Sequence, residues 1–136
     1  VIAAPREAVF AAFADPQRLA RWWGPDGFSS SFDRFEPRPG GRWIFTMHGP
    51  DGQDFANECV FLEWRAPERV VIEHLGGMHQ FVLTVLLHDE AGATRVAWRQ
   101  QFDDAAHCAQ MAPFVRPANE QNLARLEAEV LHSRPL

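Results

Sequence analysis

Histidine has the widest chemical range of any side chain in this sequence, because an imidazole can bind a metal or move a proton near neutral pH. The chain carries six histidines: His48, His74, His79, His88, His107 and His132. None of them forms the HxH, HxxxH or HExxH spacing by which one strand or helix offers several groups to a metal. We therefore expect no metal site. His74 stands out because Val70 and Ile72 put it on the apolar face of a predicted strand, where a hydrogen-bonded core histidine is the simpler interpretation.

Three glutamates in predicted strands could act as general acids or bases if burial raised their pKa: Glu58, Glu63 and Glu73. Only Glu73 can be assigned to a face of its strand: it lies on the face opposite to Val70 and Ile72, so it points outward. We find no Ser-His-Asp, Cys-His or phosphate-loop pattern, and Cys59 and Cys108 lack CxxC spacing. The sequence predicts no catalytic residue and no cofactor, and favours a protein that is not an enzyme.

Gln100 is the polar member of an otherwise apolar strand face that includes Val96 and Trp98. A buried amide without a partner costs about 1–3 kcal/mol, so Gln100 must bond either protein groups or a ligand. Trp22 and Trp23 stand where a helix should give way to strands. Either both rings lie at the opening of a pocket, or one ring is buried in the core while the other covers the junction between helix and strand.

The elements that must position these side chains follow from periodicity and turn residues. Residues 1–3 look like the end of a strand, and two short helices are expected over 5–14 and 16–21. Six strands in a meander follow, over 28–36, 42–48, 57–65, 69–75, 80–88 and 94–102. A last helix over 117–132 carries Leu123, Leu126 and Val130 at helical spacing, and Pro117 sets its start because proline is tolerated in a first turn.

Period-two alternation gives the inward faces of these strands. The inward sets are Trp43, Phe45 and Met47; Phe81, Leu83, Val85 and Leu87; and Val96, Trp98 and Gln100.

Composition narrows the class of protein. The 136 residues fit a single domain spanning 1–136, large enough to bury a core without disulfides or metal. With 13 basic residues against 18 acidic ones, and no basic stripe, nucleic acid is not expected as a partner. No apolar run is long enough to span a membrane and no signal peptide is visible, so we expect a cytoplasmic protein. The chain begins at Val1 without Met, which suggests a missing N-terminal segment.

Six segments carry a family resemblance: 4–10 (APREAVF), 22–25 (WWGP), 38–43 (RPGGRW), 50–52 (PDG), 67–71 (PERVV) and 123–126 (LARL). In order and over nearly the whole chain, they resemble the START-like (SRPBCC) superfamily. Within it they resemble the group named for homology to the activator of the ninety-kilodalton heat-shock protein ATPase. The resemblance implies an α+β helix-grip (Bet v 1-like) fold: a curved antiparallel sheet wrapped around a long C-terminal helix, with two short helices after the first strand and an apolar cavity between sheet and last helix.

One position departs from this group. Its members often carry Gly-Trp just ahead of the Leu-x-x-Leu of the last helix, and Ala118-Asn119 stands there instead. Loss of an indole would enlarge the cavity and give it an amide. We expect a cavity with Trp22 or Trp23 near its opening, bounded by Trp43, Phe45, Phe81, Trp98, Gln100, Asn119 and Leu123, with Met47 and His74 as further ligand-binding candidates.

The leading hypothesis is a protein that binds an apolar or aromatic small molecule in that cavity. The second is an enzyme resembling polyketide cyclases, in which Gln100, His74 or Asn119 steers proton transfer; a buried His–carboxylate pair would favour it. The third is a co-chaperone-like module that binds another protein; a filled core with an exposed apolar patch would favour that. A homodimer is compatible with all three.

Overall fold

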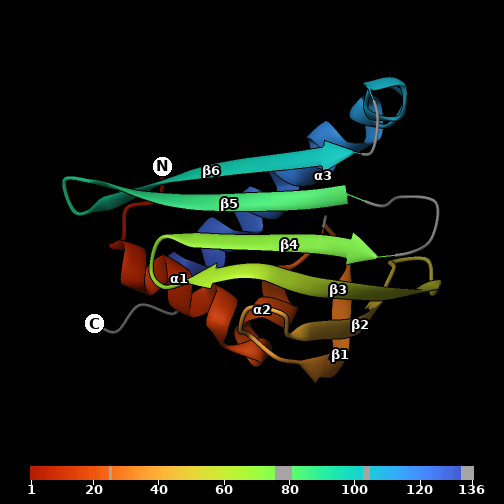
Figure 1. Ribbon diagram of the computed structural model, residues 1–136, viewed down its shortest axis with the longest axis horizontal. Helices are drawn as coiled ribbons and strands as arrows, with labels where there is room; N and C mark the ends of the chain where they lie inside the picture. The colour runs from red at the N-terminus through yellow and green to blue at the C-terminus, as the bar shows by residue number, and fades with distance from the viewer. Residues whose placement is uncertain (25, 76–80, 103–104, 133–136) are drawn as a thin grey trace.

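Six strands form one antiparallel sheet whose spatial order follows the chain (Figure 1). The computed structural model describes residues 1–24, 26–75, 81–102 and 105–132. The strands are β1 Ser29–Phe35, β2 Arg42–His48, β3 Asp54–Arg65, β4 Arg69–Leu75, β5 Phe81–Glu90 and β6 Ala93–Phe102. The helices are α1 Arg6–Ala14, α2 Pro16–Trp22 and α3 Ala105–His132. This α+β arrangement is consistent with a helix-grip fold.

Local sequence explains where the strands begin and end. In the β5–β6 hairpin, Glu90 pairs with Ala93, and the two loop residues Ala91 and Gly92 have φ of 54° and 89°. Two consecutive positive φ values give the turn whose twist matches that of the flanking strands. The predicted bounds of β2 and β4 agree with the structure, and those of β1, β3, β5 and β6 differ by up to three residues at an end.

A β-bulge in β3 keeps two large rings on the same face of the sheet. The register shifts between Phe61 and Glu63, leaving Leu62 as the extra residue. Phe61 then pairs with Ile72 and Trp64 with Val70, so both rings lie on one face although they are three residues apart. Their ring centroids are 5.2 Å apart. Without the bulge, strict alternation would turn Trp64 to the other face.

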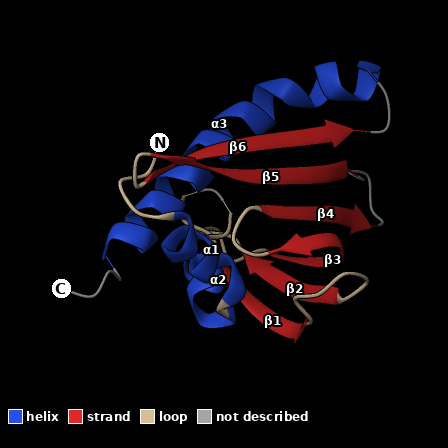
Figure 2. Cartoon of the chain, turned by 60° about the vertical axis from the view of Figure 1, so that its left-hand side comes forward, coloured by secondary structure: helices blue, strands red, loops and turns tan. Residues whose placement is uncertain are grey.

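All three helices lie on one side of the sheet (Figure 2). α3 contacts β6, α1 and α2, while α1 contacts β5 and β6. Asp15 begins α2 by accepting a hydrogen bond from the backbone N–H of Gln17 at 3.0 Å, and Pro16 takes the first helical position, where its missing N–H costs nothing. Between helices and sheet, Leu126 and Val130 join the buried core formed by the strand rings.

Two sequence expectations are wrong. Ile2 makes a single β-bridge to Thr94 instead of ending a strand, because the chain turns at once and Ala4 N–H bonds the carbonyl of Ile2 at 2.8 Å. The last helix begins at Ala105, twelve residues before 117, with Pro113 and Pro117 inside it. These two prolines are exposed and four residues apart, so they share the solvent side of the helix, where water can bond the carbonyls that lose a partner.

Aromatic rings fill the space under the helices. Trp43 is fully buried and stacks on Phe45 at a centroid distance of 4.3 Å. Trp23 meets Trp43 edge-on at 4.9 Å, and Trp22 meets Phe13 at the same distance. No helix in the described parts of the chain has the length and apolarity needed to cross a membrane.

Leu126→Ala is expected to lower the free energy of unfolding by about 2–5 kcal/mol, because the Leu126 side chain is fully buried at the centre of the helix–sheet contact. Leu131→Ala is the control on the same helix, since Leu131 is 42% exposed and should change stability by about 0.5 kcal/mol or less. Urea denaturation measures both, and equal effects would contradict the position assigned to α3.

The Gly40-Gly41 turn provides a second test. Gly40 has a φ of +79°, a left-handed conformation that reverses the chain, but a Cβ added to it would meet no atom within 4 Å. A Cβ at Gly41 would overlap the carbonyl oxygen of Glu36. Gly40→Ala should cost about 1 kcal/mol for its left-handed backbone, and Gly41→Ala about 3 kcal/mol, because the backbone must move. A smaller loss for Gly41→Ala in the same denaturation assay would show that the turn is built differently.

Cys59 should be chemically inert in the folded protein. Burial raises the pKa of its thiol to about 12, so the reactive thiolate is scarce at pH 8. In a Cys108→Ser variant, which leaves Cys59 as the one thiol, Ellman's reagent should react only after denaturant is added. Rapid reaction of the native variant at pH 8 would contradict the burial of Cys59.

Candidate ligand-binding site

One row of paired residues crosses the helix-facing side of the sheet, and its members are buried at one end and partly exposed at the other. Trp43 pairs with Cys59, Cys59 with His74, His74 with Phe81, and Phe81 with Phe102. Trp43 and Cys59 are buried, whereas the next three residues are only partly buried. We call His74, Phe81 and Phe102 the half-buried ladder. The interior is thus filled at one end of the row and accessible at the other.

His74 is held rigidly within this ladder. Its imidazole stacks on the ring of Phe81, with centroids 4.9 Å apart and planes 8° from parallel. Its Nε2 lies 2.7 Å from Oδ1 of Asn57, whose own amide N–H₂ donates to the carbonyl of Phe55 at 2.9 Å. Because Oδ1 can only accept, Nε2 carries the proton. The group at Nε2 is therefore a neutral amide and not a carboxylate.

The two amides singled out from the sequence bond each other. Asn119 Nδ2 donates to Gln100 Oε1 at 3.0 Å, which ties α3 to β6 beside the half-buried ladder. Gln100 pairs with the buried Leu83, so its amide stands on the face that elsewhere is apolar. Of the two possibilities for Gln100, a protein partner is the one observed.

Trp98 connects the amide pair to the aromatic core. It lies two residues before Gln100 on the same face of β6, and its ring centroid is 6.0 Å from Trp23 and 6.5 Å from Trp22. Trp98 is partly buried, but its indole nitrogen is shielded from water and has no hydrogen-bond partner in the part of the chain that the structure describes. Trp22, in contrast, donates its indole N–H to the carbonyl of Ala12 at 2.9 Å.

The turn after α2 is fixed by Arg125 of α3. Its guanidinium donates to the carbonyls of Arg21 at 2.6 Å, Gly24 at 2.9 Å and Phe28 at 3.0 Å. Burial lowers the pKa of Arg125. One cation therefore satisfies backbone acceptors from the end of α2 and the approach to β1, which positions Trp22 and Trp23 in the core.

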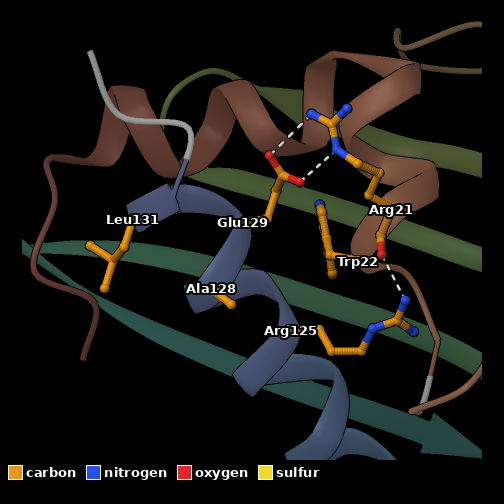
Figure 3. Close-up of a pocket in the computed structure, with 6 residues that line it drawn as sticks. All are labelled: Arg21, Trp22, Arg125, Ala128, Glu129 and Leu131. Carbon is orange, nitrogen blue, oxygen red and sulfur yellow. Dashed lines mark hydrogen bonds and ion pairs between the residues drawn. The ribbon is translucent and has the colours of Figure 1, made fainter. Parts of the chain in front are cut away.

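An open groove of about 610 Å³ lies between α2 and α3 on the outer side of Trp22 (Figure 3). Its lining consists of Arg21, Trp22, Arg125, Ala128, Glu129 and Leu131. Arg21 and Glu129 point toward one another across it and form an ion pair at 2.8 Å, which raises the pKa of Arg21. Since Arg125 bonds backbone carbonyls and Arg21 bonds Glu129, neither guanidinium is poised for an anionic ligand.

A hydrogen-bonded Ser-His-Asp chain, which no sequence spacing predicts, crosses β1, β2 and β3. Ser31 Oγ is 2.7 Å from His48 Nε2, and His48 Nδ1 is 2.8 Å from Asp54 Oδ1. This is the order of groups that activates a nucleophilic serine. However, Ser31 is exposed, and the side chains of His48 and Asp54 are 38% and 62% exposed. Water therefore competes for every group, and we interpret the chain as a cross-strand polar ladder.

The sequence-based candidates fall into separate places. Trp22, Trp23, Trp43 and Phe45 lie in the buried core, and Met47 packs against that core next to Gly24. The residues brought together at the accessible end of the face are His74, Phe81, Trp98, Gln100 and Asn119. Leu123 lines a smaller pocket of about 230 Å³ with Val96, beside the N-terminus. Within the described residues no group of three or more metal-binding side chains gathers, and His79 lies outside them.

Three contributing residues were not singled out from the sequence. Asn57 could have been found, because it alternates with Cys59 and Phe61 along one strand. Phe102 likewise follows Trp98 and Gln100 at period two. The role of Arg125 depends on three carbonyls about a hundred residues away in the chain, and no local pattern signals it.

Comparisons with known proteins agree with this architecture. A solved structure from Arthrobacter aurescens superposes with a TM-score of 0.88 at 23% identity, covering 96% of this chain and 82% of that one. One from Nitrosomonas europaea also gives 0.88, at 20% identity and 98% and 91% coverage. An AHSA1-like protein from Aeromonas hydrophila gives 0.72 at 26% identity, with 99% and 93% coverage.

No curated protein matches the chain. The family model described as "Activator of Hsp90 ATPase homolog 1-like protein" matches residues 3–130, which is nearly the full length and includes every helix and strand up to the last turn of α3. The expected resemblance is thereby confirmed, and the chain belongs to the AHSA1 family.

Proposed function

We propose that this protein binds a small apolar molecule, with at least one ring, on the accessible end of the helix-facing side of its sheet. The site consists of the half-buried ladder, Trp98 and the Gln100–Asn119 pair. The observation that carries the proposal is the change along one row of paired residues, from a fully buried Trp43 to partly exposed rings at His74, Phe81 and Phe102.

Aromatic side chains left partly exposed on an interior face favour a ligand for a physical reason. A ring placed against the stacked His74 and Phe81 would remove apolar area from water, at about 25 cal/mol per Å². Those side chains are already held in place by hydrogen bonds and stacking, so little rotamer entropy is lost on binding. Few polar groups at an apolar surface are also typical of small-molecule sites.

The two alternative functions receive less support. A cyclase-like enzyme would be favoured by a buried histidine–carboxylate pair, whereas His74 Nε2 bonds the amide of Asn57. A protein-interaction module would be favoured by one large apolar patch. The large apolar residues that are exposed in the described chain are instead scattered over the N-terminus (Val1), positions seven residues apart in β3 (Phe55 and Leu62) and the end of α3 (Leu131). We retain a cytoplasmic location in this proposal; a homodimer and a chaperone partner stay predictions.

Asn119→Trp should weaken binding of an uncharged naphthalene probe about tenfold or more, because an indole at this partly buried position would occupy the surface that the probe needs. Quenching of tryptophan fluorescence measures the affinity.

One control separates filling of the site from the general effect of an added indole. Glu120→Trp adds an indole at the next, exposed position of α3. It should bind the probe within about threefold of the parent protein. Parent affinity in Asn119→Trp, with the fold intact by circular dichroism, would remove Asn119 from the site.

A further inference from the structure

We infer that the ligand carries a hydrogen-bond acceptor oxygen, such as a carbonyl, and that the indole N–H of Trp98 donates to it. This inference rests on the proposed function, since it names the chemical class of the molecule bound at the same site. It follows from how the indole groups of the aromatic core are satisfied.

The fold provides a partner for one interior indole and none for two others. Trp22 donates to the carbonyl of Ala12 at 2.9 Å. The indole nitrogens of Trp43 and Trp98 are both shielded from water and make no hydrogen bond to any described residue. A buried donor without an acceptor is destabilising, and such groups in folded proteins call for an explanation.

The surroundings of Trp43 differ from those of Trp98. Trp43 is fully buried, and five aromatic rings lie within 6.1 Å of its own: Trp23, Phe32, Phe35, Phe45 and Phe61. Ring faces accept N–H groups weakly, and a ligand cannot reach this position without displacing the core. The missing acceptor at Trp43 therefore has a structural explanation.

Trp98 lacks that enclosure. Its two aromatic neighbours, Trp22 and Trp23, lie toward the core, and the residue as a whole is partly exposed. Because the ring of Trp98 is partly exposed, a small turn of the ring brings its shielded N–H toward a molecule bound beside it. This donor then selects a ring compound with an acceptor oxygen over a pure hydrocarbon. A shielded N–H also gains that bond at little further cost in desolvation.

The test uses two probes of nearly the same shape, 2-acetylnaphthalene and 2-isopropenylnaphthalene, in which a C=O group replaces a C=CH₂ group. The parent protein should bind the ketone about fivefold more tightly, the value of one neutral hydrogen bond. In Trp98→Phe, which keeps a ring and removes the N–H, the two affinities should become equal. Trp64→Phe is the matched control. Trp64 lies on the same face of the sheet as Trp98, and the two residues are joined across the strands by the pairs Trp64–Val70, Val70–Val85 and Val85–Trp98. This variant should keep the preference for the ketone.

A second measurement does not depend on any variant folding well. In the parent protein, the assigned ¹H–¹⁵N signal of the Trp98 indole should move downfield with the ketone and stay in place with the alkene. Equal affinities of the parent protein for both probes, or a preference that survives in Trp98→Phe, would overturn the acceptor inference and leave the binding site intact. Failure of both probes to bind would overturn the proposed function together with it.

Discussion

The structure depends on how one arginine holds the turn that follows α2. Three backbone carbonyls point toward α3 there, and acceptors left outside regular helix and strand pairing need other partners. Arg125 supplies all of them from α3, and Asn122 adds a bond to the carbonyl of Trp22 at 2.9 Å. These bonds fix α3 against α2 and the entry to β1, so the two tryptophans of the turn must lie over the sheet. The remaining packing follows from that placement.

Once Trp22 and Trp23 occupy the middle of the helix-facing side, the sheet is divided into two regions. Rings from α1, α2 and the first three strands fill one region, with the fully buried Trp43 at its centre. In the other region Val70, Ile72, Leu83 and Val85 are still buried, and only the side chains at one end of β4, β5 and β6 are partly covered: His74, Phe81, Trp98, Gln100 and Phe102. The filled region accounts for stability, and the partly covered one is where a ligand can add contacts that the chain does not make with itself. The open groove at Trp22 lies outside both.

The regular spacing of apolar residues was enough to predict the fold. The features that could not be predicted depend on contacts between residues far apart in the chain. Period-two alternation predicted the faces of Trp43, Phe45 and Trp98 because each strand is buried on one side only. The start of α3 was misplaced because a proline is read as a boundary, whereas an exposed proline can remain within a long helix. The bond between Gln100 and Asn119 joins two residues that were each recognised as unusual, but only the packing of α3 on β6 brings them together.

Chemical-shift mapping of the ¹⁵N-labelled protein with 2-acetylnaphthalene tests the account most directly, because it locates a ligand without assuming a site. The account predicts that shifted backbone amides cluster at 72–74, 81–85, 98–102 and 118–123, which surround the half-buried ladder and the Gln100–Asn119 pair. Amides around the groove of Arg21 and Glu129 should stay in place. No shifts at millimolar probe, or shifts confined to that groove, would contradict the claim that the open end of the sheet binds a small molecule.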